Sequence, residues 1–179
     1  TRLCHTSAPV TFGGLDSEGT PRPTGFQRDP ARLLPLPQNA RRLRVEIEQR
    51  LATARALIET STLFSRQGPA QGPRAILAAG VPAATSADVL AARGLTDTTP
   101  LLTLAAVHPL PESWLLTQLK GLRELLVIEE LSPFIEDNLS AICHLHGIDL
   151  HITGKRTGHL PIYHEYEPPL LEAAILNFL

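Results

Sequence analysis

The sequence predicts an α/β fold of three layers, with helices on both faces of a mostly parallel sheet. The first observation is a set of short apolar runs, which are Arg74–Ala79, Leu101–Val107, Glu124–Leu131 and Ile148–Thr153. The second is that helical patterns separate these runs along the chain. The third is that the runs are apolar almost throughout, as in strands whose two faces are both covered. Alternation of such strands with helices indicates parallel pairing through right-handed crossovers.

Capping residues and apolar spacing predict the helices that follow the strands. The predicted helices are Ser86–Gly94 with Ser86 as N-cap, Glu112–Leu122, a helix from Ser132 to Gly147 with Pro133 in its first turn, and Pro168–Phe178. In the third of these helices, Glu136 and Asp137 are predicted near the positive end of the helix dipole. The compact α/β part is therefore expected to span residues 72–179.

The amino-terminal part of the chain has a different character. Residues 1–38 show no sustained period, and Gly13–Gly25 reads as a loop because it is rich in Gly, Pro and Ser. A helix is predicted over Asn39–Phe64, since Leu43, Ile47, Leu51, Ala54 and Ile58 recur at helical spacing. The Gly- and Pro-rich stretch Gly68–Pro73 reads as a linker. The predicted divisions are residues 1–38, 39–71 and 72–179.

Composition excludes several classes of function. A hydrophobic content of 43% suits a folded core. A net charge of −2 gives no indication of a basic surface that would bind nucleic acid or an anionic membrane. No membrane span or signal peptide is visible. Two cysteines, Cys4 and Cys143, give no disulfide framework, so a reducing cytoplasm is expected. Because the chain starts at Thr1 and contains no methionine, we expect a segment of a longer protein.

Glu129 and Glu130 end the central predicted strand, where ligands of open α/β sheets bind. The pair could act as acid and base. However, neighbouring residues of a strand point to opposite faces, which places them poorly for such a dyad. The structural alternative is that one glutamate accepts hydrogen bonds from the following loop or helix start.

Two further sites are candidates for substrate or interface contacts. His108, before Pro109, leaves a strand at the ligand-bearing edge and could contact a substrate or a partner, or be an ordinary turn residue. Lys155 and Arg156 lie in the glycine-bearing segment Thr153–His159, which could touch an anion such as a diphosphate or the phosphates of coenzyme A. A solvated loop is the alternative for that segment.

The sequence offers no convincing metal or phosphate site. Cys143, His144, His146 and His151 lie close in sequence, but their spacing does not match four convergent zinc ligands. A buried cysteine with solvated histidines is the preferred interpretation. The pair Gly13-Gly14 matches neither a dinucleotide fingerprint nor a phosphate loop.

Several blocks, in a fixed order, carry a resemblance to a known family. The blocks are Thr1–Thr6, Arg28–Arg41, His108–Pro111, Glu129-Glu130, Pro133–Glu136, and Gly158–Pro161 with Glu165 following. Together they resemble the transketolase C-terminal-like domain, with its preceding linker, of 2-oxoacid:ferredoxin oxidoreductases, and most nearly the alpha subunit of indolepyruvate ferredoxin oxidoreductase. The chain departs from the family pattern at three places. His108 replaces a tyrosine, His164 replaces a glycine, and Ala83–Thr85 lacks a usual tyrosine.

The resemblance implies a parent enzyme that oxidatively decarboxylates indolepyruvate or another aryl pyruvate to an acyl-CoA. Such a parent would use thiamine diphosphate, magnesium and [4Fe-4S] clusters, and would pass electrons to ferredoxin. Residues 1–38 would then end the preceding thiamine-pyrimidine domain and connecting loop, and residues 39–71 would form the linking helix. This segment would contribute no catalytic residue and bind no cofactor alone.

The expected partners are the other domains of the parent chain and its second subunit, in an oligomer, with coenzyme A and ferredoxin as partners of the whole enzyme. Substrate or interface candidates are His108, Glu129, Glu130, Lys155, Arg156 and Glu165. Two alternatives stay open. One is a non-catalytic scaffold or assembly domain of the same fold, and the other is a C-terminal domain of the transketolase or 2-oxoacid dehydrogenase beta type.

Overall fold

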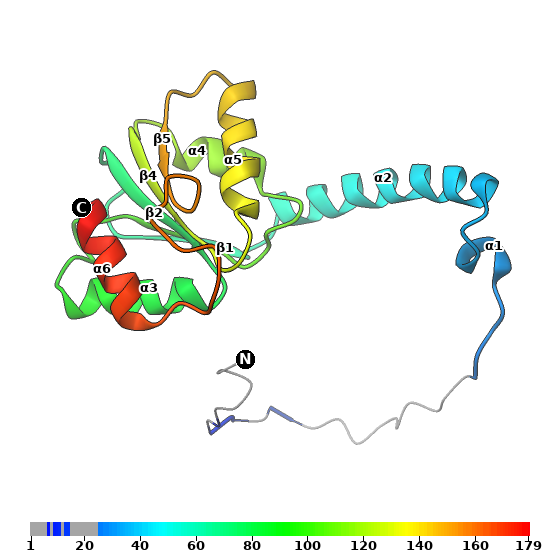
Figure 1. The fold of residues 1–179 in the computed structure, drawn as a ribbon, viewed down its shortest axis with the longest axis horizontal. Helices are drawn as coiled ribbons and strands as arrows, with labels where there is room; N and C mark the ends of the chain where they lie inside the picture. Colours follow the sequence, from blue (N-terminus) through cyan, green and yellow to red (C-terminus); the bar gives the residue numbers. More distant parts are fainter. Residues whose placement is uncertain (1–6, 8, 12, 15–24) are drawn as a thin grey trace. The chain divides into compact units, whose positions relative to one another are not determined.

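A computed structural model describes residues 7, 9–11, 13, 14 and 25–179 of the chain (Figure 1). The chain divides into two compact units, Thr1–Arg50 and Leu51–Leu179. The family-like block at Thr1–Thr6, with Cys4, and most of the predicted loop Gly13–Gly25 lie outside the described residues. The three predicted divisions of the chain stay predictions.

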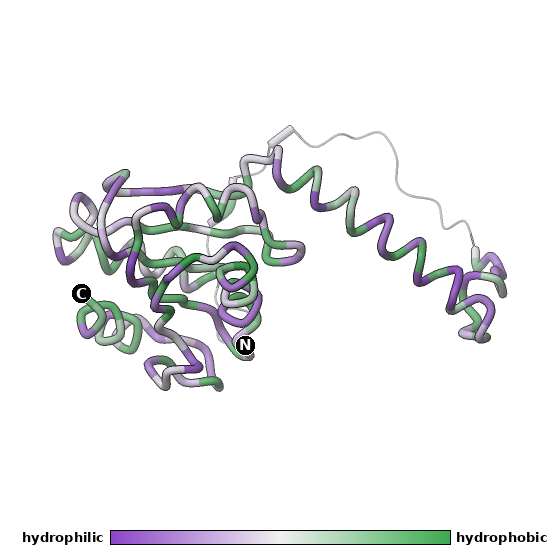
Figure 2. Tube along the Cα trace, turned by 90° about the horizontal axis from the view of Figure 1, so that it is seen from above, coloured by the Kyte–Doolittle hydropathy of each residue, from purple (hydrophilic) through white to green (hydrophobic). Residues whose placement is uncertain are grey.

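The helix predicted in the amino-terminal part is present as α2, which spans Pro37–Glu59. It ends before Phe64, because Thr60 and Ser61 turn their hydroxyls back to helix carbonyls and close the last turn. A short helix that the sequence analysis missed, α1 (Pro30–Leu33), precedes it, and Asp29 caps α1 by accepting the Arg32 N–H at 3.1 Å. No residue of α2 is buried, and apolar and polar stretches alternate along it (Figure 2).

The second unit is built on a five-stranded sheet with the order β1-β3-β2-β4-β5. The strands are β1 (Phe64–Gln67), β2 (Arg74–Ala79), β3 (Leu101–Leu104), β4 (Glu124–Ile128) and β5 (His151–Thr153). Four of them run parallel, and β1 pairs antiparallel with β3 at the edge. The predicted fold class, a three-layer and mostly parallel α/β architecture, is therefore confirmed.

Helices cover both faces of this sheet. They are α3 (Val81–Ala92), α4 (Glu112–Gln118), α5 (Phe134–Leu145) and α6 (Pro168–Phe178). Alternate residues of β2 enter different cores, with Leu77 packing in the core that contains Leu115 of α4 and Leu139 of α5. Ile76 faces the other way, into the core formed with α3 and α6. Period-two alternation thus explains why the strands are apolar throughout.

After β2, the chain adds β3 on one side of β2 and then adds β4 on the other side. From β2 the chain crosses through α3 to β3 on one side, and then through α4 to β4 on the other side. The two crossover helices lie on opposite faces, as right-handed connections require. The carboxyl ends of β2 and β4 therefore form a topological switch point, the place where open α/β sheets usually bind ligands.

Three local predictions need correction. Helix α3 begins at Val81 rather than at Ser86, because Pro82 suits a first helical turn. Ser86 is buried inside α3 and donates its hydroxyl to the Pro82 carbonyl at 2.7 Å instead of capping the helix. Strand β1 lies at Phe64–Gln67, where the sequence analysis placed a helix end and the approach to a linker.

Within the described residues, no helix is both long and apolar enough to cross a membrane.

Candidate functional site

A cavity of about 310 Å³ lies at the switch point, beside the carboxyl ends of β2 and β4. Its lining comes from three loops and strand ends: Ala79, Gly80 and Pro82 at the end of β2, Val107 after β3, and Glu129, Glu130, Ser132, Phe134 and Ile135 after β4. The lining is thus mostly apolar, with two glutamates and one serine. This mixture is typical of small-molecule sites.

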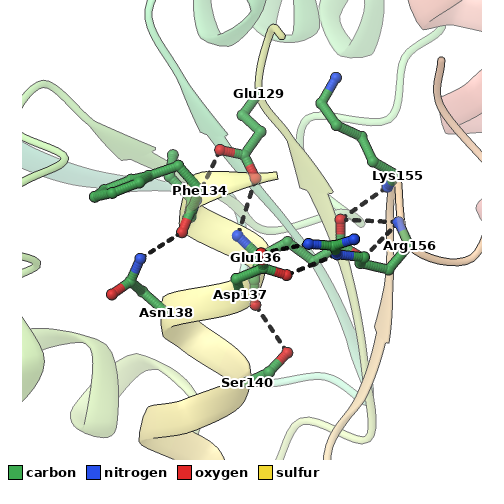
Figure 3. A network of polar contacts seen from close by, with 9 residues as sticks. Glu129, Phe134, Glu136, Asp137, Asn138, Ser140, Lys155 and Arg156 are labelled. Carbon is green, nitrogen blue, oxygen red and sulfur yellow. Dashed lines mark hydrogen bonds and ion pairs between the residues drawn. The ribbon is translucent and has the colours of Figure 1, made fainter. Parts of the chain in front are cut away.

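Glu129 joins the end of β4 to the start of α5. Its carboxylate accepts the Ile135 N–H at 2.7 Å and the Glu136 N–H at 2.9 Å (Figure 3). These N–H groups belong to the first turn of α5, which lacks partners for them within the helix. Glu129 therefore caps α5, and the interpretation that one glutamate of the pair serves a helix start is confirmed. The predicted cap Ser132 was wrong, since α5 has no side-chain cap from its own N-cap residue, Pro133.

Glu136 connects α5 to the loop after β5. Its buried carboxylate accepts the Lys155 N–H at 2.8 Å and the Arg156 N–H at 3.1 and 3.2 Å. In Figure 3 the Lys155 side chain runs away from Glu136 while its backbone nitrogen faces the carboxylate. The residue thus fixes the path of this loop by backbone contacts, a role that the sequence analysis missed.

Lys155 is buried, so the interpretation of its segment as a solvated loop was wrong at this residue. Its ammonium group donates to the Pro161 carbonyl at 2.9 Å and to the Tyr166 hydroxyl. The Tyr166 hydroxyl in turn donates to the same carbonyl at 2.6 Å, and the Tyr166 N–H donates to Glu130 Oε1 at 3.1 Å. Tyr166, another residue that the sequence analysis missed, therefore links Glu130 at the end of β4 to the buried lysine.

Burial dominates the electrostatics of this cluster. Desolvation raises the pKa of Glu129 above its ordinary value of 4.5, although two backbone hydrogen bonds and the charge of Lys155 act in the opposite direction. Desolvation also lowers the pKa of Lys155, against the attraction of Glu129, Glu136 and Glu130. The pKa of the Tyr166 hydroxyl is raised by burial and by the same carboxylates. Within residues 25–179, no basic side chain forms a salt bridge with any of these three glutamates.

The other candidates lie around this cluster rather than in the cavity. Arg156 is exposed and forms a bidentate pair with Asp137, at 2.8 and 2.7 Å, so its guanidinium group is engaged within the chain. The ring of His108 packs edge-on against Phe134, with ring centroids 5.8 Å apart, beside the cavity that Phe134 lines. Glu165 is half-buried next to Tyr166 and does not line the cavity.

The cysteine and histidines near the end of α5 do not converge. Cys143 is buried, which raises the pKa of its thiol, while His144, His146 and His151 are exposed. His146 Nε2 lies 2.8 Å from a carboxylate oxygen of Glu112. In the part of the chain that the structure describes, no three His, Cys, Asp or Glu side chains gather where they could hold a metal ion.

Comparison with curated proteins supports the resemblance that the motifs carry. The indolepyruvate oxidoreductase subunit IorA of Methanothermobacter thermautotrophicus is 30% identical over 176 residues, which is 98% of this chain and 28% of the relative. The subunits of the same name from Archaeoglobus fulgidus and Thermococcus kodakarensis are 28% and 27% identical and match 100% of this chain. The chain spans little more than a quarter of the length of these relatives. No protein-family model matches the sequence.

A solved structure shares the fold. The 2-oxoglutarate:ferredoxin oxidoreductase from Magnetococcus marinus superposes with a TM-score of 0.52 at 13% sequence identity, over 79% of this chain and 23% of that one. The match concerns the architecture alone, given the low identity. The sequence alignment with the IorA subunits, by contrast, spans 98% or more of this chain. This chain is therefore homologous, over nearly its whole length, to one segment of the indolepyruvate oxidoreductase IorA subunits.

Proposed function

We propose that this chain is the α/β module of one subunit of an indolepyruvate:ferredoxin oxidoreductase. Such an enzyme oxidatively decarboxylates a 2-oxoacid. The observation that carries the proposal is the similarity to IorA subunits along 98% of the chain. The shared fold with an oxidoreductase structure that has 2-oxoglutarate, coenzyme A and succinyl-CoA bound adds support at the level of architecture. An aryl pyruvate as substrate, coenzyme A as acceptor and ferredoxin as electron carrier follow from this proposal.

Within that enzyme, the module would supply assembly and channel contacts rather than the cofactor site. The polar groups at the switch point support this division, because Glu129 and Glu136 serve backbone N–H groups and Lys155 is held inside the chain. The described residues also do not fit thiamine diphosphate, since the acidic lining of the cavity would repel a diphosphate. The thiamine diphosphate, magnesium and [4Fe-4S] clusters of the proposed enzyme would therefore be held by other domains.

The activity can be tested on the complete polypeptide that carries this sequence, produced together with its second subunit. Indolepyruvate should support reduction of ferredoxin or methyl viologen in the presence of coenzyme A, and should be preferred to 2-oxoglutarate and pyruvate. A cofactor-loaded complex that reduces neither acceptor with any 2-oxoacid would contradict the proposal. That result would instead favour a scaffold domain.

The proposal that other domains hold the cofactor has a separate test. Calorimetric titration of the 179-residue chain with thiamine diphosphate and magnesium should give no saturable heat. Saturable binding with a Kd in the micromolar range, a binding free energy of about −8 kcal/mol, would overturn the proposal that other domains hold the cofactor.

We also infer that His108 contacts the substrate channel or a neighbouring subunit, because its ring lies beside Phe134 at the ligand-bearing edge of the sheet. In the complete enzyme, His108→Ala should raise KM for the 2-oxoacid or weaken subunit association, each by severalfold. His151→Ala is the matched control, since His151 is exposed at the opposite, amino end of β5. If neither property changes relative to that control, His108 is only a turn residue.

A further inference from the structure

The cavity at the switch point has a chemical character that the proposed function does not use. Its volume of about 310 Å³ is at the lower end of the range for small-molecule sites. It belongs wholly to the second compact unit and lies where open α/β sheets bind ligands. The nature of its lining therefore indicates which class of small molecule would be complementary.

Apart from the hydroxyl of Ser132, the polar side chains of the lining are acidic. Glu129 and Glu130 are the acidic residues of the lining, and no lysine, arginine or histidine of the described part of the chain lines the cavity. The nearby ammonium group of Lys155 does not compensate, because it is directed to the Pro161 carbonyl and the Tyr166 hydroxyl. Of the two oxygens of Glu130, only Oε1 has a hydrogen bond to a described residue. The acidic side chains of the lining thus offer carboxylate oxygens and negative charge, which favour a cation over an anion at this end of the cavity.

The apolar part of the lining suits a compact hydrocarbon or aromatic group. Pro82 and Ile135 form buried wall, while Val107 and Phe134 remain 38% and 43% exposed and line the cavity from two different loops. The ring of His108 supports Phe134 from the side. An apolar group that covered Val107 and Phe134 would remove their exposed surface from water, which favours binding.

From these observations we infer that the cavity binds a small primary ammonium ion with a compact apolar or aromatic body. The ammonium group would lie at Glu130, and the apolar body would lie against Val107 and Phe134. A protonated amine provides donors and a positive charge, which match the Glu130 carboxylate, whose Oε2 accepts no hydrogen bond from a described residue. The inference does not depend on the oxidoreductase proposal, because it rests only on the lining of the cavity.

Phenethylammonium chloride is the probe, titrated into the 179-residue chain labelled with nitrogen-15. Saturable shifts are expected at the amides of Gly80, Glu130 and Phe134. Two probes of similar shape test the charge, namely neutral 2-phenylethanol and anionic 3-phenylpropanoate. The alcohol should bind about tenfold more weakly and the anion should not bind, because only the ammonium group brings a positive charge to Glu130.

Glu130→Gln should weaken phenethylammonium binding about tenfold. The amide oxygen of this variant can still accept the Tyr166 N–H, so the fold is expected to persist, and the dispersion of the spectrum checks this. Glu172→Gln makes the same charge change on α6, away from the cavity, and should leave binding unchanged. Three results would each overturn the inference. They are the absence of saturation up to about 10 mM, equal binding of the alcohol, and shifts that fall outside the cavity.

Discussion

The carboxylate of Glu136 occupies the space that a side chain on Gly154 would need. A Cβ atom on Gly154 would lie 2.8 Å from Glu136 Oε2 and 3.0 Å from Glu136 Cδ. Glu136 is buried and holds the Lys155 and Arg156 N–H groups, so it cannot move away without losing those hydrogen bonds. Glycine is therefore required here by close approach.

Gly154→Ala should accordingly destabilise the chain by about 1–3 kcal/mol, the usual cost of overpacking a filled site. Urea unfolding followed by circular dichroism measures the change. Gly72→Ala is a matched control, because the nearest atom to its added Cβ lies 3.8 Å away, at ordinary contact distance. A loss in Gly154→Ala no greater than in the control would show that Glu136 relaxes freely.

Glu129 should make stability fall as pH rises. Its pKa is raised in the folded state, so its contribution is fully present below its ordinary value of 4.5 and is lost as pH rises through the folded value. Glu129→Gln has no such ionisation. The unfolding free energy of the wild type, minus that of Glu129→Gln, should therefore shrink as pH rises from about 4 toward the neutral range.

Thermal or urea unfolding across this pH range measures that difference. Glu124→Gln, at the other end of β4, is the control for a charge change on the same strand. A difference that stays constant or widens with pH would contradict the assignment of desolvation as the dominant effect on Glu129.

Tyr166→Phe should destabilise the chain by about 1–3 kcal/mol, because it removes a buried acceptor from the Lys155 ammonium group. The aromatic ring and its packing are kept. Tyr163→Phe makes the same chemical change at a side chain that is 66% exposed, and should stay within about 0.5 kcal/mol of wild type. Equal effects of the two variants in urea unfolding would exclude an energetic role for the Lys155–Tyr166 contact.

Asp137 should affect stability at acidic pH, with the opposite sign to Glu129. Its pKa is lowered by the hydrogen bonds from Arg156, so its contribution is present above its ordinary value of 3.8 and is lost as pH falls through the folded value. Asp137→Asn should remove this acid-dependent loss, and about 1 M salt should weaken it, because the pair is exposed. Acid titration followed by circular dichroism, with Asp88→Asn as control, tests the prediction. An unchanged acid midpoint in Asp137→Asn would count against it.

The layers of the fold could be predicted because local sequence patterns indicate which strands are covered on both faces. Strand β4 is apolar at four successive positions, Leu125–Ile128, and only a strand covered on both faces accommodates such a run. Strand β1 could not be found in this way, since Phe64–Gln67 alternates between half-buried and exposed residues at a sheet edge. The start of α3 was missed for a different reason. No residue of Val81–Thr85 indicated the start of a helix, whereas Ser86 is a type of residue that commonly caps helices, although it does not cap α3.

The candidate site was predictable only in part. The position of Glu129 at the end of a buried strand, just before a helix, indicated both the edge of the sheet and a possible capping role. The contact of Glu136 with the Lys155 N–H joins residues 19 positions apart and leaves no local pattern. Likewise, nothing near Lys155 in the sequence shows that Tyr166 and Pro161 bury its charge. Long-range polar contacts of this kind depend on the completed fold.

The short strands at the two sides of the sheet have a consequence for the chain in solution. An exposed strand edge can pair with the edge of another molecule, and long, flat edges are the usual starting points of aggregation. Here the outer strands β1 and β5 contain only four and three residues. Each therefore offers few backbone groups to a second sheet, so the module should resist edge-to-edge association at the concentrations that calorimetry and NMR require.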